Sequence, residues 1–416
     1  MLSLPVFTRR WLCLAALAGA AHAAAADAPL TLAAAQQLAV RHSSLLPAKN
    51  LATAAAREMA VAAAQLPDPV LKAGIDNLPV SGAGKFSLGS DFMTMRRIGV
   101  MQELTGSDKR HWRAEKSRRE AERAQAAREA ARASVERETA LAWLERYYTE
   151  QMAAVVAEQA GQSRLEVAAA EGAYRAGRGS QADILAARSA LGMAEDQADE
   201  WQRRVRTART MLVRWTGSDA GLAGTPPITT LSMLAQASHH PDIGILGRQQ
   251  DIAEAEVRLA QANEKPDWSV EVAFQQRGPA YANMVSFGVS VPLQWDRKQR
   301  QDRELAARLA MLDEAKAERE EMLREHAASI ESMLEEWRSG RARMERFAAS
   351  LLPLAAQRTQ AVAAAYRGGK ASLSELLLAQ RSDIDTRLQS LQLQLNTARV
   401  WAQLQFILPG QTGAAQ

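Results

Sequence analysis

The residues with the clearest chemical potential are two carboxylates that follow a repeated glycine-containing turn. Asp183 stands three residues after Ser180, and Glu375 stands three residues after Ser372. This Ser-x-x-Asp/Glu spacing is typical of a capping box, in which serine and carboxylate exchange hydrogen bonds at the start of a helix. The same carboxylates could also attract cations if several copies lined a narrow passage. The two roles are compatible, and the spacing leaves both open.

The remaining candidate motifs do not have the spacing of an active site. Gly82-Ala83-Gly84-Lys85 is not a phosphate-binding loop, because Pro79 stands five positions before Gly84 where that loop needs glycine. Met93, Met95 and Met101 could offer soft metal ligands, but ordinary packing is the simpler interpretation. The histidines lack zinc spacing, and His239-His240 fits a surface pair. We therefore expect no catalytic residues, no cofactor and no metal site.

The composition indicates long helices packed through small side chains. Apolar residues make up 47% of the 416 residues, mainly through alanine, whereas aromatic residues make up only 5%. The 51 basic and 47 acidic residues give a formal charge of +4, and the two signs alternate along the chain. This alternation argues against nucleic acid as a partner.

The N-terminus has the features of a secretory signal peptide. Arg9-Arg10 precede an apolar stretch, Trp11 to Ala21, which leads into the small-residue exit Ala21-His22-Ala23. We expect residues 1–23 to be removed, which would also remove the only cysteine, Cys13. The mature chain would then lie outside the inner membrane without disulfides or thiolate chemistry.

The sequence indicates an internal duplication. Three markers recur in the same order at nearly one offset: Ala173–Ser180 with Ala365–Ser372, Pro67-Asp68 with Pro266-Asp267, and Ile98-Gly99-Val100 with Phe287-Gly288-Val289. We expect a first repeat over 24–216, a connector over 217–241 and a second repeat over 242–416.

Each repeat is expected to contain the same succession of elements. A helical stretch (about 30–65 and 231–264) precedes a β-hairpin (about 68–104 and 267–293), a long helix, a turn (174–180 and 366–372) and a return helix. The first long helix is predicted with most support, because no glycine or proline interrupts Ser107 to Ala160. Its counterpart starts near Arg297, and Gly340 and Pro353 are expected to loosen it.

The hairpins are predicted from alternating apolar and polar residues. Trp268–Gln275 and Val285–Leu293 alternate most clearly, and Leu71–Asp76 follows the same pattern. The strand around Ile98 is the weakest prediction, because charged and polar residues interrupt it. Alternation alone also permits a small soluble sheet. Charged residues on the polar faces, and Trp268 and Trp295 at strand ends, favour membrane strands.

Four strands cannot close a barrel, since about eight is the smallest number that encloses filled space. Open strand edges are also too costly in lipid, because every unpaired backbone group there costs several kcal/mol. The sequence therefore predicts that several copies pool their strands.

The duplicated halves, the hairpins and the paired Tyr-x-x-Gly-x-x-Ser turns followed by Asp or Glu resemble the outer-membrane efflux proteins, the TolC-like channels. The resemblance covers essentially the whole mature chain. It implies a mixed fold, in which each chain of a homotrimer contributes four strands to a transmembrane β-barrel and long antiparallel helices to a periplasmic α-barrel. It also implies localisation in the outer membrane and contact with its lipid. A periplasmic adaptor (a membrane fusion protein) and an inner-membrane RND-type pump are the implied protein partners.

The resemblance also implies roles for individual residues. Asp183, Tyr366 and Glu375 match positions that constrict the periplasmic entrance. The adaptor contact runs through the turns, at Tyr174, Gly177, Ser180, Gly369 and Ser372. Two positions depart from the family pattern, since Ala371 replaces an arginine and Leu378 replaces an acid.

The sequence leaves alternatives for the cargo and for the functional class of the protein. Compact loops and a short C-terminal tail resemble the heavy-metal efflux branch, so metal cations are the expected cargo. The alternatives are a multidrug or other small-molecule efflux channel, a periplasmic coiled-coil adaptor or scaffold, and a secreted hydrolase carried on helices.

Overall fold

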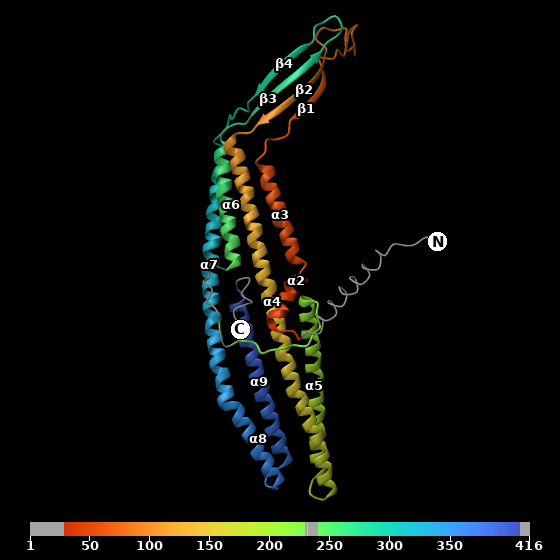
Figure 1. Cartoon of the computed structure of the whole chain (residues 1–416), viewed down its shortest axis with the longest axis vertical. Helices are drawn as coiled ribbons and strands as arrows, with labels where there is room; N and C mark the ends of the chain where they lie inside the picture. Colours follow the sequence, from red (N-terminus) through yellow and green to blue (C-terminus); the bar gives the residue numbers. More distant parts are fainter. Residues whose placement is uncertain (1–28, 229–230, 232–239, 408–416) are drawn as a thin grey trace, which may run out of the picture. The chain divides into compact units, whose positions relative to one another are not determined.

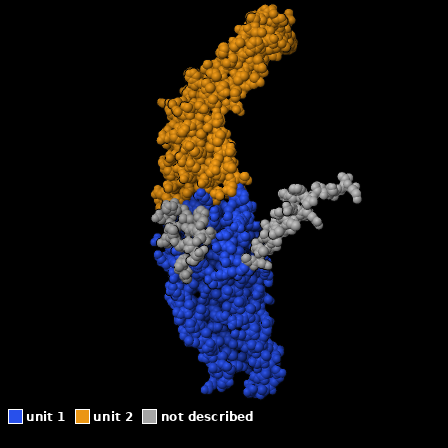
Figure 2. Space-filling model, in the orientation of Figure 1, with its two compact units in different colours: residues 1–47, 129–241, 325–416 blue, residues 48–128, 242–324 orange. Residues whose placement is uncertain are grey.

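The computed structural model describes residues 29–228, 231 and 240–407. The expected signal peptide, residues 1–23, lies outside the described residues, and the connector 217–241 is described in part. The chain forms two compact units, coloured blue and orange in Figure 2. Unit 1 comprises Met1–Pro47, Glu129–Pro241 and Glu325–Gln416, and unit 2 comprises Ala48–Arg128 and Asp242–Arg324. Each unit therefore combines segments from both halves of the sequence.

Unit 2 consists of a sheet and a group of helices. Its helical part contains most of α3 (Leu45–Ala63) and α6 (Pro241–Asn263), together with the first portions of α4 (Ser107–Arg175) and α7 (Gln301–Arg346). The four strands follow these helices at one end of the unit (Figure 1).

The four expected strands form one antiparallel sheet in the order β1-β2-β3-β4. They are β1 (Val70–Asp76), β2 (Met95–Leu104), β3 (Trp268–Gln276) and β4 (Met284–Ser290). β2, predicted from the weakest pattern, is the longest strand, because β1 and β3 pair with it on both sides. β4 ends at Ser290 rather than at the expected Leu293, and Pro292 has no N–H with which to continue a ladder.

The pairing register separates the side chains into two faces of different character. On one face the large apolar side chains are exposed, with Phe287 at 80%. These residues are Leu71, Ile75, Ile98, Val100, Leu104, Trp268, Val270, Val272, Phe274, Val285, Phe287 and Val289. We call this set the apolar sheet face. Its polar members, Arg96, Gln102 and Gln276, lie near strand ends.

The opposite face carries charged groups that join three strands. Lys72 of β1 forms an ion pair with Glu271 of β3 at 2.8 Å, and Arg97 of β2 pairs with the other oxygen of the same carboxylate. Gln275 donates a hydrogen bond to Ser286 at 3.0 Å, which extends the polar contacts to β4. Strand alternation thus gives one charged face and one apolar face on a single sheet.

Unit 1 is built entirely of helices and connecting segments among the residues described. It contains α2 (Leu32–His42), α5 (Gln181–Thr216), α8 (Leu352–Arg367), α9 (Leu373–Gln405) and the remaining portions of α4 and α7. Its main core includes Trp143, Leu144, Met152, Leu212, Leu395 and Trp401. The Trp143 indole N–H donates to the Leu30 carbonyl at 2.9 Å, so this large side chain is buried without an unsatisfied donor.

The second long helix, expected to loosen at Gly340 and Pro353, is irregular only near Pro353 among the described residues. α7 continues through Gly340, where a Cβ would overlap Thr397 of α9, so glycine here permits close helix packing. The irregularity is a π-helical segment, Phe347–Leu351, which ends two residues before Pro353. Proline lacks the N–H of a regular turn and its ring crowds the carbonyl four residues earlier, which accounts for the wider turn.

No helix among residues 29–228, 231 and 240–407 is long and apolar enough to cross a membrane.

A buried ion pair ties the sheet of unit 2 to α4. Lys109, only 5% exposed, pairs with Asp267 at 2.9 Å, and the same carboxylate accepts the Gly106 N–H at 3.1 Å. Partial burial alone would raise the pKa of Asp267, but these two hydrogen bonds outweigh it and hold that pKa below its usual value. Asp267 therefore fixes the start of β3 against the start of α4.

We expect Asp267→Asn to destabilise this junction, because it leaves the Lys109 ammonium buried without its counter-charge. The loss should be about 3 kcal/mol in the free energy of unfolding, and thermal melting followed by circular dichroism measures it. Asp68→Asn is the matched control, since Asp68 occupies the corresponding Pro-Asp motif but is exposed. Equal melting temperatures for the two variants would contradict the assignment.

Candidate functional site at the paired helix turns

Two helix turns with related sequences lie at the same end of unit 1 (Figure 1). One joins α4 to α5 and the other joins α8 to α9. They contain nearly all the residues that the sequence singled out. The motif in each turn determines a local conformation, and the two conformations can be compared directly.

Both turns end their first helix with the same hydrogen-bond pattern. In the first, the Arg178 N–H donates to the Ala173 carbonyl at 2.9 Å and the Gly177 N–H donates to Tyr174 at 3.0 Å. In the second, Lys370 and Gly369 make the corresponding bonds to Ala365 and Tyr366, at 2.8 and 3.0 Å. This is the Schellman arrangement, which needs a left-handed residue after the helix.

Glycine supplies that left-handed residue in each case. Gly177 has φ +71° and Gly369 has φ +70°. Open space surrounds both positions where a Cβ would be added, so the requirement is one of backbone conformation rather than of crowding.

The next helix of each pair begins with the predicted capping box. The Ser180 hydroxyl accepts the Asp183 N–H at 3.1 Å, and the Asp183 carboxylate accepts the Ser180 N–H at 2.9 Å. Ser372 and Glu375 make the same exchange at 3.2 and 2.7 Å. The capping interpretation is therefore confirmed at both positions.

The caps also keep both carboxylates charged. Hydrogen bonds from the Ser180 backbone and hydroxyl hold the pKa of Asp183 below its usual value. The same two groups of Ser372 lower the pKa of Glu375. Each turn thus presents an ionised carboxylate at neutral pH, whatever its further role.

The two tyrosines of the motif differ in environment. Tyr174 is 50% exposed, whereas Tyr366 is partly buried against a small apolar cluster. The buried members of this cluster are Ala170, Ala187, Leu373 and Leu376, which come from α4, α5 and α9. Tyr366 of α8 thus helps to hold the two helix pairs together.

Exposed basic side chains surround the turns: Arg175, Arg178, Arg367 and Lys370. Of the predicted constriction residues, Asp183 and Glu375 lie in the first turns of α5 and α9, and Tyr366 lies in the last turn of α8. The predicted contact residues belong to the two turn motifs themselves. The geometry establishes the positions of these residues and the caps that the serines and carboxylates among them form. Their roles in constriction and in adaptor contact stay predictions.

Sequence reasoning missed a cavity on the same unit. It has a volume of about 680 Å³ and lies between α4, α5 and α9, with Glu166, Asp196, Arg381 and Asp385 among its lining residues. Burial raises the pKa of Glu166, although a hydrogen bond with Gln380 partly opposes that shift. Glu166 is one of many acids on a long helix, so no local pattern distinguishes it.

Neither a protein-family model nor a curated protein matches the sequence. Solved structures share the fold. The outer membrane protein VceC of Vibrio cholerae has a TM-score of 0.74 at 18% identity, with 91% of this chain and 96% of that chain covered. For the CmeC outer membrane channel of Campylobacter jejuni the TM-score is 0.69 at 13% identity, with 90% and 85% covered.

A third structure, the open state of the MtrE outer membrane channel of Neisseria gonorrhoeae, has a TM-score of 0.63 at 18% identity and covers 92% of this chain and 89% of that chain. The chain therefore has the fold of outer-membrane channels. In particular, the predicted mixed TolC-like fold, with long helices and a four-stranded antiparallel sheet, is confirmed.

The caps lead to an expected pH dependence at the start of α9. A lowered folded-state pKa means that Glu375 stabilises the cap fully above the ordinary glutamate pKa of about 4.3. This stabilisation is lost as the pH falls through the folded-state pKa. Hydrogen exchange of the amides at Leu373 to Leu376, corrected for intrinsic rates, should show protection that declines on acidification.

Glu375→Gln should flatten this pH dependence, because the amide oxygen still accepts a hydrogen bond but does not titrate. Glu331→Gln, on the exposed middle of α7, is the control and should behave like the parent protein. Protection that declines equally in Glu375→Gln would show that another group governs it.

Proposed function

We propose that the protein is an outer-membrane efflux channel, the exit duct of a pump–adaptor–channel export system. One observation carries the proposal: a four-stranded sheet that exposes a nearly continuous apolar face and carries ion pairs on the other. In water the apolar sheet face would be a large unfavourable surface, whereas lipid would cover it at little cost.

The polar face supports the same proposal. The Lys72–Glu271–Arg97 network suits a wet interior, where charged side chains remain hydrated. β1 and β4 each pair on one side only within the described chain, so their outer edges need partners in lipid. Three copies joined edge to edge would supply those partners, which favours a homotrimer that pools its strands into one closed barrel.

The helical unit supplies the periplasmic part of the duct in this proposal. Asp183, Tyr366 and Glu375 would constrict the entrance, where threefold symmetry gathers three ionised copies of each carboxylate. Tyr174, Gly177, Ser180, Gly369 and Ser372 would contact the periplasmic adaptor, and an RND-type inner-membrane pump would supply the cargo. The protein would transport and not catalyse.

Heavy-metal cations are the proposed cargo. Rings of carboxylates whose pKa values are lowered stay negative at neutral pH, and such rings favour cations over anions. The competing cargo, a drug or another small molecule, would require no such preference at the entrance.

The channel proposal predicts a trimer that conducts. Protein extracted from the membrane fraction should have the mass of a homotrimer in detergent and should form ion-conducting pores in planar bilayers. A monomeric, non-conducting product in the soluble periplasmic fraction would instead support the coiled-coil adaptor or scaffold.

The entrance residues can be tested in the same bilayers. Asp183→Asn combined with Glu375→Gln should lower cation selectivity and leave trimer mass unchanged, since both substitutions keep hydrogen-bond acceptors in the caps. Glu331→Gln is the control that removes one exposed carboxylate elsewhere on unit 1. Equal selectivity in the two variants would remove the proposed constriction role.

The cargo is tested in a host strain that lacks the channel. Restoring the chain together with its adaptor and pump should raise tolerance to transition-metal salts several-fold and leave drug tolerance unchanged. Rescue of drug tolerance alone would favour the small-molecule alternative, while the channel itself would still stand.

A further inference from the structure

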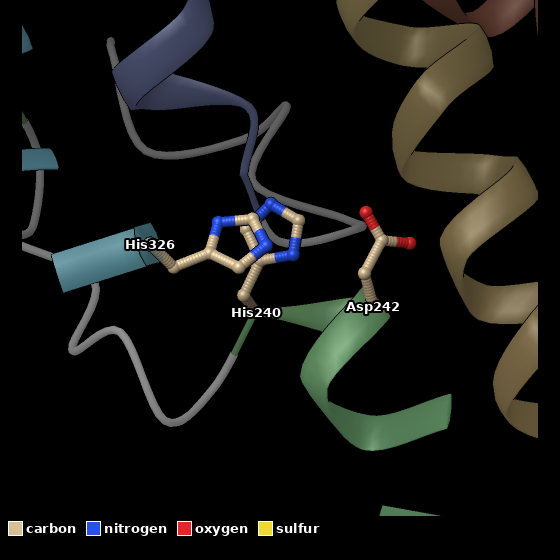
Figure 3. Close-up of side chains that lie close together, drawn as sticks. All are labelled: His240, Asp242 and His326. Atoms are coloured by element: carbon tan, nitrogen blue, oxygen red, sulfur yellow. The ribbon is translucent and has the colours of Figure 1, made fainter. Parts of the chain in front are cut away.

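Two histidines far apart in the sequence form a close pair in unit 1. The rings of His240 and His326 are stacked, with centroids 4.0 Å apart and planes at 28° (Figure 3). Both side chains are half-buried. His326 belongs to α7, and His240 stands directly before α6, so no sequence spacing could have paired them.

A carboxylate accompanies this pair. Asp242 stands two residues after His240, in the first turn of α6, so the chain itself keeps the two close. One ligand atom from each of His240, Asp242 and His326 lies within 4.8 Å of the others. In the part of the chain that the structure describes, no other group of three or more histidine, cysteine and acidic residues approaches this closely.

We propose that His240, His326 and Asp242 form a binding site for a divalent transition-metal ion, with Zn²⁺ as the representative ion. Two imidazole nitrogens and one carboxylate oxygen are a ligand set that zinc accepts, with bonds of about 2.0–2.2 Å and one further position for water. Ligands of a tetrahedral ion lie a little over 3 Å apart, so the three groups must draw together.

Side-chain rotation can accomplish this approach. The stacked rings must turn so that one nitrogen of each faces the ion, and rotation about the Cα–Cβ and Cβ–Cγ bonds moves those nitrogens by more than the distance required. The Asp242 carboxylate is exposed, and rotation about its own side-chain bonds can bring one oxygen toward the ion.

The other histidines provide a useful contrast. His111 lies edge-on against Trp112, and the ring of His42 is next to Gly217. Neither stands with two further ligands among the described residues. His111 is therefore the matched control for a surface histidine that could bind metal on its own.

This site does not rest on the proposed channel function and differs from the carboxylates of the turns. A metal held here would stabilise the protein, whatever the cargo. The experiment therefore measures binding and stability rather than transport.

The test uses the full-length, untagged protein in detergent, with its metal removed by a chelator. Titration with ZnCl₂ in a calorimeter should give one ion per chain, and Zn²⁺ should raise the melting temperature. His326→Ala and His240→Ala should each weaken binding at least tenfold, whereas His111→Ala should bind as the parent protein does.

Co²⁺ provides a second readout that does not depend on stability. It should give the visible absorption of a low-symmetry site in the parent protein, and that signal should be lost in His326→Gln, which keeps a polar side chain if His326→Ala fails to fold. Sub-stoichiometric binding, or binding and absorption that persist in both histidine variants, would overturn the proposal. Conductance of the same variants would remain as a separate measure of the channel function.

Discussion

A β-sheet is complete only when every strand edge finds a partner, and this requirement governs what the chain can do. Its sheet pairs β1 through β4 and ends at two edges that no other described strand covers. The apolar sheet face adds a second requirement, because its exposed apolar side chains need an apolar environment to cover them. Lipid satisfies the face and neighbouring copies satisfy the edges, so membrane insertion and assembly become one event in the proposed function. The proposed role of the unit 1 turns also depends on that assembly, since only several copies together can place the turn carboxylates in a ring.

The matching motifs of the two halves do not all lie in matching environments. Tyr366 packs against the cluster that joins the helix pairs, whereas Tyr174 is exposed at the equivalent turn position. Asp267 anchors a buried lysine, whereas Asp68 of the same motif is exposed. In contrast, the Schellman turns and capping boxes are the same in both halves. The two halves thus share local backbone conformations at the turns but differ in how the corresponding side chains pack.

The features that the sequence predicts well are those determined by near neighbours. The capping boxes follow from a serine and an acid three residues apart, and the strands follow from alternation over a few residues. The features it misses depend on distant segments. The sequence predicts that Gly340 weakens a helix, whereas in the fold it permits close contact with Thr397. The sequence pattern of β2 is weak, but pairing with β1 and β3 makes it a full strand. The His240–His326 pair and the cavity beside Glu166 belong to the same class, because each requires helices that meet only after folding.

The central pairing of the sheet has a consequence for how the protein is made. β2 and β3 are neighbours in space, yet α4, α5 and α6 separate them along the chain. A ladder between such remote segments closes a very long loop, which slows folding and raises contact order. It also cannot form while a ribosome has made only the first half. In the proposed function, the exported polypeptide carries unpaired apolar strands until it assembles, so it must be shielded from aggregation before then.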